Sequence, residues 1–102
     1  MIARVANFEG VDVQAAQGSM DEAEAVIRPL VEGLAGYEGH LDLATQDGKF
    51  LSITLFDTEA NAAAAEPTFD VEMPKQLGEL FQSWGGQRTS VDRYQVVSDS
   101  RG

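Results

Sequence analysis

Apolar and polar residues alternate along two runs that meet at Asp47-Gly48, and together these runs extend from His40 to Phe56. An Asp-Gly pair between alternating runs is typical of a β-hairpin, whose tight turn requires positive φ at both positions. Apolar side chains of the second run point to both faces of the strand. Leu51, Ile53 and Leu55 share one face, and Phe50 and Phe56 share the other. We therefore expect both faces of this strand to be covered.

A helix is predicted before the hairpin, because apolar residues recur there at helical spacing. Its start matches a capping box from Ser19 to Glu22, in which the serine hydroxyl accepts a hydrogen bond from a backbone N–H of the first turn. We expect Pro29 to kink this helix without breaking it, since the apolar stripe continues in phase beyond the proline. Gly36 can take the left-handed conformation that ends a helix.

A second helical region is predicted after the hairpin. Thr58 can cap a short helix through an alanine-rich tract that stops near Pro67. Met73-Pro74 then opens a longer helix, because proline is favoured at the first helical position. We expect this helix to end at Gly85-Gly86. Its apolar stripe consists of Leu77, Leu80, Phe81 and Trp84.

A strand-like segment lies near each end of the chain, from Ile2 to Phe8 and from Val91 to Val97. Residues 9–18 read as a polar loop and residues 98–102 as a frayed tail. The order strand, helix, hairpin, helix, strand predicts one α+β domain over residues 1–102, a sandwich with an antiparallel sheet and helices on one face. The chain contains no second helical layer for the other apolar face of the sheet.

Composition narrows the classes of function. Seventeen acidic and seven basic residues give a net charge of −10, which repels phosphate backbones and anionic headgroups, so we expect binding to neither nucleic acid nor membranes. The chain has no cysteine, which excludes thiol nucleophiles, disulfides and thiolate metal sites. Neither a leader-like segment nor an apolar run of about 18 residues is present, so we expect a cytoplasmic protein.

Three short segments of the sequence are similar to segments of a known protein family. They are Ala3-Arg4-Val5-Ala6-Asn7, Leu34-Ala35-Gly36-Tyr37-Glu38-Gly39-His40 and Leu55-Phe56-Asp57-Thr58-Glu59-Ala60. Together with the order of the elements, they resemble the ferredoxin-like dimeric α/β barrels, and in particular the antibiotic-biosynthesis-monooxygenase-like family. The resemblance spans nearly the whole chain, from Ile2 to about Val97.

The resemblance implies that two subunits pack sheet against sheet, so that a homodimer covers the second apolar face. It also implies that a small hydrophobic or aromatic ligand binds between the sheet and the helices. Some members of the family oxidise aromatic polyketides or quinols with molecular oxygen and no cofactor, because the substrate itself forms the carbanion that reduces oxygen. We accordingly expect neither a cofactor nor a metal.

Asn7 and His40 are the candidate catalytic residues. The position of Asn7 matches the strand asparagine that the family directs into its pocket, where an amide can donate a hydrogen bond to a phenolate. His40 is the only histidine, and imidazole accepts and releases protons near neutral pH. Each also has a structural interpretation, because Asn7 can bond a loop backbone and His40 can simply lie at the start of a strand.

Five aromatic residues are candidates for substrate binding: Tyr37, Phe69, Phe81, Trp84 and Tyr94. A stripe at helical spacing is also typical of an ordinary core, and the two phenols can equally bond backbone carbonyls. A buried indole needs an acceptor for its N–H. We expect Arg93 to pair with Asp92 or with an acid of a partner subunit. Haem-degrading relatives have a histidine in the second helical segment, and because this chain has none there, we do not expect haem.

Three functions are compatible with the sequence. The first is a cofactor-independent monooxygenase-like enzyme acting on a small aromatic or quinol-type substrate in the cavity between sheet and helices. The second is a non-catalytic dimeric binding module for a hydrophobic metabolite, and the third is an isomerase or decarboxylase of carbon acids. One scaffold supports many activities, so the fold alone does not decide among them.

Overall fold

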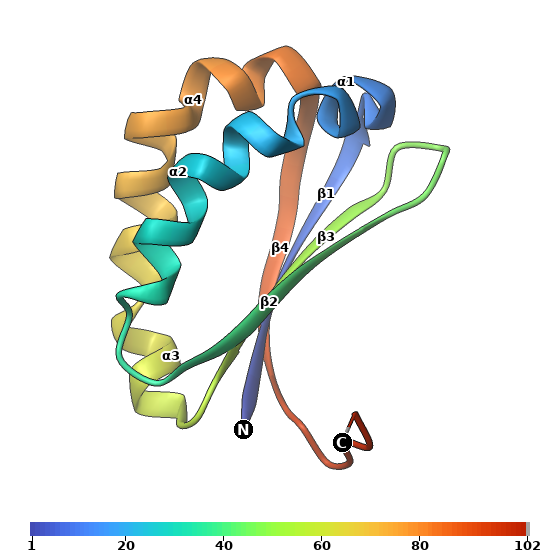
Figure 1. The fold of residues 1–102 in the computed structure, drawn as a ribbon. Coiled ribbons are helices and arrows are strands. Elements are labelled where there is room, and N and C mark those ends of the chain that lie inside the picture. The colour runs from blue at the N-terminus through green and yellow to red at the C-terminus, as the bar shows by residue number, and fades with distance from the viewer. Residues whose placement is uncertain (102) are drawn as a thin grey trace.

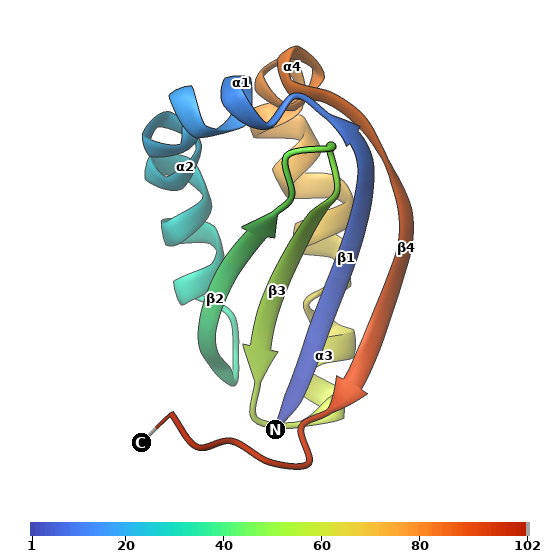
Figure 2. The ribbon, with the colours of Figure 1, turned by 90° about the vertical axis from the view of Figure 1, so that its right-hand side faces the viewer.

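In the computed structural model, which describes residues 1–101, helices pack on one face of an antiparallel sheet (Figure 1, Figure 2). The strands are β1 (Ile2–Val11), β2 (Tyr37–Ala44), β3 (Phe50–Phe56) and β4 (Gly85–Gln95). The helices are α1 (Val13–Gly18), α2 (Met20–Glu32), α3 (Glu59–Ala64), the π-helical segment η1 (Thr68–Glu72) and α4 (Met73–Trp84). The predicted α+β ferredoxin-like fold is confirmed.

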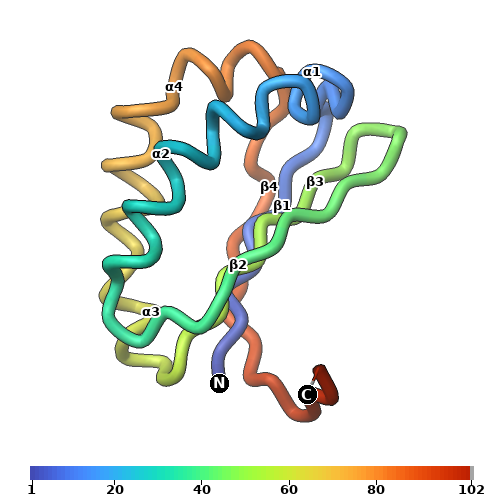
Figure 3. Tube along the Cα trace, in the orientation of Figure 1, coloured from blue at the N-terminus to red at the C-terminus, as the bar shows by residue number. Residues whose placement is uncertain are grey.

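The sheet has the order β2-β3-β1-β4, and neighbouring strands are antiparallel. Figure 2 shows β1 between β3 and β4, and Figure 3 shows the helices to one side of the strands. Because side chains alternate along a strand, the register separates an inner face, which meets the helices, from an outer face. One inner row crosses the four strands. It consists of His40, Thr54, Arg4 and Arg93.

The inner face and the helices enclose the hydrophobic core. Phe56 on β3 is fully buried there, and so are Ala23 on α2 and Ala62 on α3. Small residues at these helix positions let the helices approach the sheet closely. The remaining members of the core cluster are Ala16, Ile27, Val31, Ala65, Phe69, Met73, Leu77 and Trp84.

The outer face is also apolar, as the alternation in β3 predicted. Leu41 pairs with Ile53, and Ile53 pairs in turn with Val5 on β1, which forms an apolar row across three strands. Leu41 and Leu43 have 42% and 46% of their surface exposed. Large aliphatic groups in water are unfavourable, so this face is suited to being covered by another surface.

Two predicted boundaries near the chain ends are wrong. Residues 9–18 are not a loop, because β1 continues to Val11 and α1 follows, capped by Asp12, whose Oδ1 accepts from the N–H of Ala15 at 3.1 Å. The last strand begins at Gly85 and ends at Gln95, instead of spanning 91–97. Glycine at position 86 lets the start of β4 lie close to β1, because a Cβ there would lie only 2.9 Å from the carbonyl oxygen of Glu9.

The helix before the hairpin begins directly after Ser19, as predicted, but its capping bond and its end differ from the prediction. Ser19 makes no capping bond to α2 and instead donates from Oγ to the carbonyl oxygen of Ala15 at 3.0 Å. The helix ends at Glu32, four residues before Gly36. Gly36 has φ +76 and lies in the turn toward β2, where a Cβ would lie 2.0 Å from Oδ1 of Asp57. Glycine is therefore required there by backbone conformation and by space.

The hairpin turn and the second helical region differ from prediction in detail. Among residues 1–101 positive φ occurs only at glycines, so Asp47 does not take it, and Gly48 alone does with φ +97. The turn is longer than the tight two-residue type, because β2 ends at Ala44 and β3 begins at Phe50. Within it the N–H of Gly48 donates to the carbonyl oxygen of Thr45 at 3.2 Å. Thr58 caps α3 as predicted. Pro67 has helical backbone angles, so the helical region does not stop there and continues through η1 into α4. No helix within residues 1–101 is long and apolar enough to span a membrane.

Candidate functional site

A cavity of about 380 Å³ lies between the inner face of the sheet and the helices. Ligand pockets typically measure roughly 300–1,000 Å³, so this cavity suits a small ring system. Its wall is mainly apolar and comes from β1, β3, α2, η1 and α4. The apolar residues lining it include Ala6, Phe8, Ile27, Phe50, Phe69, Met73, Phe81 and Trp84.

Aromatic rings form a continuous part of this wall. The ring centre of Trp84 lies 5.2 Å from that of Phe81 and 6.4 Å from that of Phe50, which in turn lies 6.1 Å from Phe8. These separations are typical of favourable aromatic pairs. The indole N–H of Trp84 donates to Oγ of Ser19 at 2.7 Å. The indole is therefore satisfied within the protein and presents its ring, instead of its donor, to the cavity.

A histidine–aspartate pair on β2 lies at the polar side of the cavity. His40 and Asp42 are two residues apart on one strand, so both side chains point to the inner face. Nε2 of His40 lies 3.1 Å from Oδ1 of Asp42, and Nδ1 lies 2.8 Å from Oγ1 of the fully buried Thr54. A hydroxyl can donate or accept, so Thr54 supports either neutral tautomer of the imidazole and also the protonated ring.

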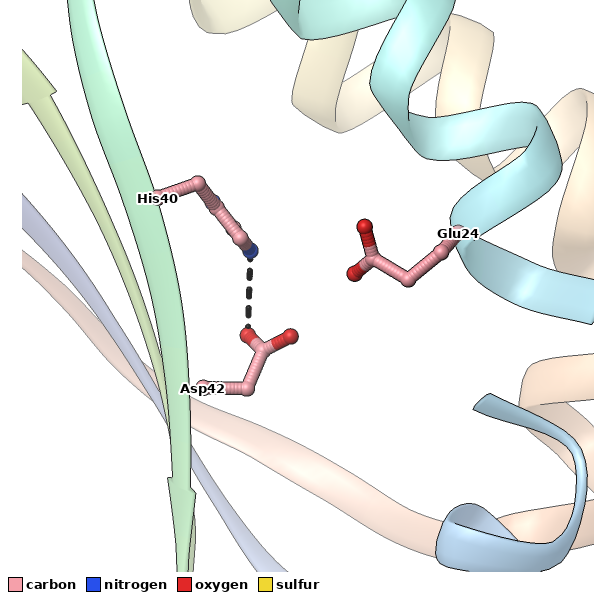
Figure 4. Close-up of side chains that lie close together, drawn as sticks. All are labelled: Glu24, His40 and Asp42. Carbon is pink, nitrogen blue, oxygen red and sulfur yellow. Dashed lines mark hydrogen bonds and ion pairs between the residues drawn. The ribbon is translucent and has the colours of Figure 1, made fainter. Parts of the chain in front are cut away.

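Glu24 on α2 faces the His40–Asp42 pair from the opposite side (Figure 4). One ligand atom of each residue, a carboxylate oxygen or an imidazole nitrogen, lies within 4.8 Å of the others. The Nε of Arg28 lies 3.7 Å from Glu24 and offsets part of the negative charge. The cluster thus has members on both the helix layer and the edge strand of the sheet.

A buried arginine forms another polar part of the cavity wall. Arg4 is 2% exposed and contacts Glu66 in a bidentate manner, from Nε at 2.9 Å and from Nη2 at 3.2 Å. Its guanidinium lies 3.9 Å from the ring centre of Phe69. Burial of this charge is tolerable because the carboxylate and the ring face both stabilise it. The pair fixes η1 and Phe69 against the sheet.

The structure brings together four of the seven residues predicted for the site. His40, Phe69, Phe81 and Trp84 all line the cavity. Tyr37 packs against the core beyond the cavity lining, where burial, with a smaller effect from Glu32, raises the pKa of its phenol.

The other two predicted site residues lie on the outer face. Asn7 donates from Nδ2 to Oγ of Ser90 on β4 at 3.0 Å, and it lies outside the lining of the inner cavity. Tyr94 pairs in register with Ala3 and is 55% exposed. The expectation that Asn7 points into the pocket between sheet and helices is therefore wrong.

Sequence reasoning missed Arg4, Glu24, Asp42 and Thr54. The spacing of His40 and Asp42 on a predicted strand was a usable signal, because alternate strand positions share a face. Arg93 was expected to pair with Asp92 or with an acid across a dimer. Instead its Nε contacts Glu59 at 2.6 Å, because residue 93 lies on the inner face beneath α3.

Comparison with known proteins finds solved structures of similar fold. No family model and no curated protein match the chain. A dimeric ferredoxin-like protein from an uncultured marine organism has a TM-score of 0.72 and 14% identity, over 97% of this chain and 96% of that chain. A candidate antibiotic biosynthesis monooxygenase from Bordetella bronchiseptica has a TM-score of 0.68 and 18% identity, over 95% and 97%.

A third solved structure is SnoaB, a cofactor-independent oxygenase from Streptomyces nogalater, with a TM-score of 0.65 and 9% identity over 99% of this chain and 97% of that chain. At these identities the likenesses show the ferredoxin-like fold alone. The neighbours include antibiotic-biosynthesis-monooxygenase-like proteins, the group that the sequence resembles.

Proposed function

We propose that this protein is a cofactor-independent monooxygenase-like enzyme that acts on a small aromatic or quinol-type substrate. The observation that supports this most is the cavity of about 380 Å³, which is lined both by aromatic rings and by the His40–Asp42 pair. Such a site can hold a flat, electron-rich substrate against Phe81 and Trp84. A likeness in fold to an oxygenase that needs no cofactor supports the same reading.

The proposed chemistry begins with removal of a proton from the substrate. The His40–Asp42 pair accepts it, and Thr54 holds the imidazole in place at 2.8 Å. The carbanion then passes one electron to dioxygen, and recombination forms a carbon–oxygen bond in a peroxide. Return of the proton and loss of water leave a carbonyl, so that one oxygen atom enters the product and the other leaves as water. The apolar wall keeps bulk water from the anion.

We also propose that the protein is a homodimer whose subunits pack outer face against outer face. The exposed Leu41 and Leu43, with Ile53 and Val5 beside them in the register, supply the apolar surface for this contact. A two-fold interface is self-complementary, so the same patch serves both subunits. The inner cavity then remains separate in each subunit.

The second candidate function is a dimeric module that binds a hydrophobic metabolite without turnover. One observation favours it: both nitrogens of His40 and the indole N–H of Trp84 already have partners within the protein. A cavity whose polar groups are satisfied can hold an apolar ligand by burial alone.

Oxygen uptake with an anthrone or a reduced quinone tests the proposal. The wild-type chain should consume oxygen, and His40→Gln should lower kcat by about 10²–10⁴-fold through loss of the base. Glu38→Gln is the matched control, because Glu38 is an exposed carboxylate on the same strand. Circular dichroism should show that both variants retain the fold.

Three outcomes separate the candidate functions. Oxygen uptake that depends on His40 supports the oxygenase. Binding of the same compounds without oxygen uptake supports the binding module. Exchange of the acidic carbon-bound hydrogen for deuterium without oxygen uptake supports the isomerase or decarboxylase of carbon acids. Either of the last two outcomes contradicts the proposed oxygenase.

A further inference from the structure

We infer that Glu24, His40 and Asp42 form a binding site for a divalent transition-metal ion of the Zn²⁺ or Mn²⁺ class. This inference goes beyond the proposed function, since it concerns ion binding in the absence of substrate and oxygen, and an ion on Nε2 of His40 and proton transfer to that imidazole are alternative states of the same residue. The three side chains come from α2 and β2 and converge on one point (Figure 4). They supply one imidazole nitrogen and two carboxylate groups, a mixed set that suits first-row metals better than Mg²⁺ or Ca²⁺.

The spacing of the three groups matches that of ligands around one ion. Ligand atoms that lie about 2.0–2.2 Å from an ion are separated from one another by roughly 3.0–3.5 Å in tetrahedral or octahedral sites. Nε2 of His40 and Oδ1 of Asp42 lie 3.1 Å apart. Glu24 lies within 4.8 Å of both and has a flexible side chain. A small movement of one carboxylate therefore completes the set.

A supporting residue already orients the imidazole. Nδ1 of His40 lies 2.8 Å from Oγ1 of Thr54, which is fully buried and pairs with His40 in the β2–β3 register. When an ion takes Nε2, the proton resides on Nδ1 and is donated to this hydroxyl. Histidines that bind metals typically have such a partner on the second nitrogen, because it fixes the ring and the tautomer.

The charge and position of the cluster also favour an ion. Glu24 and Asp42 each contribute one negative charge, and Arg28, at 3.7 Å from Glu24, offsets part of it. His40 and Asp42 line the cavity, so an ion held by them lies at the cavity wall. Because the ligands come from both layers of the fold, binding joins α2 to the sheet and stabilises the folded chain.

Isothermal titration of the full chain, prepared without a histidine tag and stripped with a chelator, tests the site. Titration with ZnCl₂ should give one equivalent per chain. Glu24→Gln and Asp42→Asn should each weaken binding by at least about 10-fold, and Thr54→Val by about 10-fold through the freed imidazole. Glu22→Gln is the matched control, an exposed carboxylate on the same helix, and should bind as the wild type does.

Further readouts separate this site from scattered surface carboxylates. Zn²⁺ should raise the Tm of the wild type more than that of Glu24→Gln, whose Tm without metal reports whether it folds. Electron paramagnetic resonance of Mn²⁺ should show the same loss in Glu24→Gln. Equal binding by Glu24→Gln and Glu22→Gln, no binding at all, or a preference for Mg²⁺ or Ca²⁺ over Zn²⁺ would each overturn the inference. None of these results depends on oxygen uptake, so the two proposals can fail separately.

Discussion

The two faces of the sheet contain similar aliphatic and aromatic residues but have different surroundings. On the inner face Phe56 is fully buried beneath the helices, whereas on the outer face Leu43 leaves 46% of its surface exposed. The inner face also contains polar groups, and Arg4, Thr54 and His40 each have a partner there. Alternation along a strand therefore predicts two apolar faces, while the packing partner of each face decides its role.

The largest expected effect is on the inner face, where Phe56→Ala should lower the free energy of unfolding by about 3–5 kcal/mol. The reason is the loss of a fully buried ring and the cavity left behind. Urea denaturation measures it. Val97→Ala is the control, since Val97 is 94% exposed, and should change stability by no more than about 0.5 kcal/mol. A similar small change for Phe56→Ala would contradict the account of the inner face.

The next largest effect is expected for the buried ion pair. Arg4→Met should lower the free energy of unfolding by about 3 kcal/mol, because Glu66 loses its bidentate partner in a low-dielectric environment. The double variant Arg4→Met with Glu66→Gln should recover part of this loss in the same denaturation experiment.

Arg93→Met provides the comparison for this pair. Its contact with Glu59 is more exposed, and its contact with Glu66 is longer, at 3.6 Å, so the expected loss is about 0.2–1 kcal/mol. If both arginine variants were equally stable, burial would not distinguish the two pairs and the prediction for Arg4 would be wrong.

A smaller effect is expected where the indole meets α2. Ser19→Ala should lower the free energy of unfolding by about 1–2 kcal/mol, because Nε1 of Trp84 loses its acceptor at 2.7 Å. Trp84 is the only tryptophan, so its fluorescence emission reports the change directly. Ser83→Ala, which removes an exposed hydroxyl on α4, should leave the emission unchanged. An unchanged spectrum in Ser19→Ala would argue against this hydrogen bond.

The smallest expected effect concerns alkaline pH. Burial raises the pKa of Tyr37 above its ordinary value of 10.0, so the folded chain favours the neutral phenol. Stability from this preference is present below pH 10 and is lost as pH rises through the higher pKa of the folded state. Urea denaturation between pH 8 and pH 11 should therefore show a steeper loss for the wild type than for Tyr37→Phe. Parallel curves would contradict a raised pKa of Tyr37 in the folded chain.

Much of the fold was predictable because its signals are local. The hairpin, the helix stripe that includes Phe81 and Trp84, and the cap at Thr58 all depend on residues close in sequence. The early start of β4 was not predictable from the hydrophobic pattern, because residues 85–90 contain no apolar alternation although they pair with β1. α1 is too short to show a helical period.

The site was less predictable, because its geometry depends on tertiary contacts between residues that are distant in sequence. β1 has apolar residues at Ile2, Val5 and Phe8, which lie on opposite faces, so the sequence does not reveal that the face shared by Val5 and Asn7 is the outer one. The contact of Glu24 with His40 and Asp42 depends on how α2 crosses the sheet. The pairing of Arg4 with Glu66 joins residues 62 positions apart. Such contacts follow from packing and have no local signature.

The mass of the protein in solution, measured by light scattering at micromolar concentration, tests most directly the claim that a second copy covers the outer face. We expect a mass of two chains for the wild type and of one chain for Leu43→Lys, with circular dichroism unchanged because Leu43 is not part of the core cluster. A mass of one chain for the wild type would show that no second copy covers the outer face.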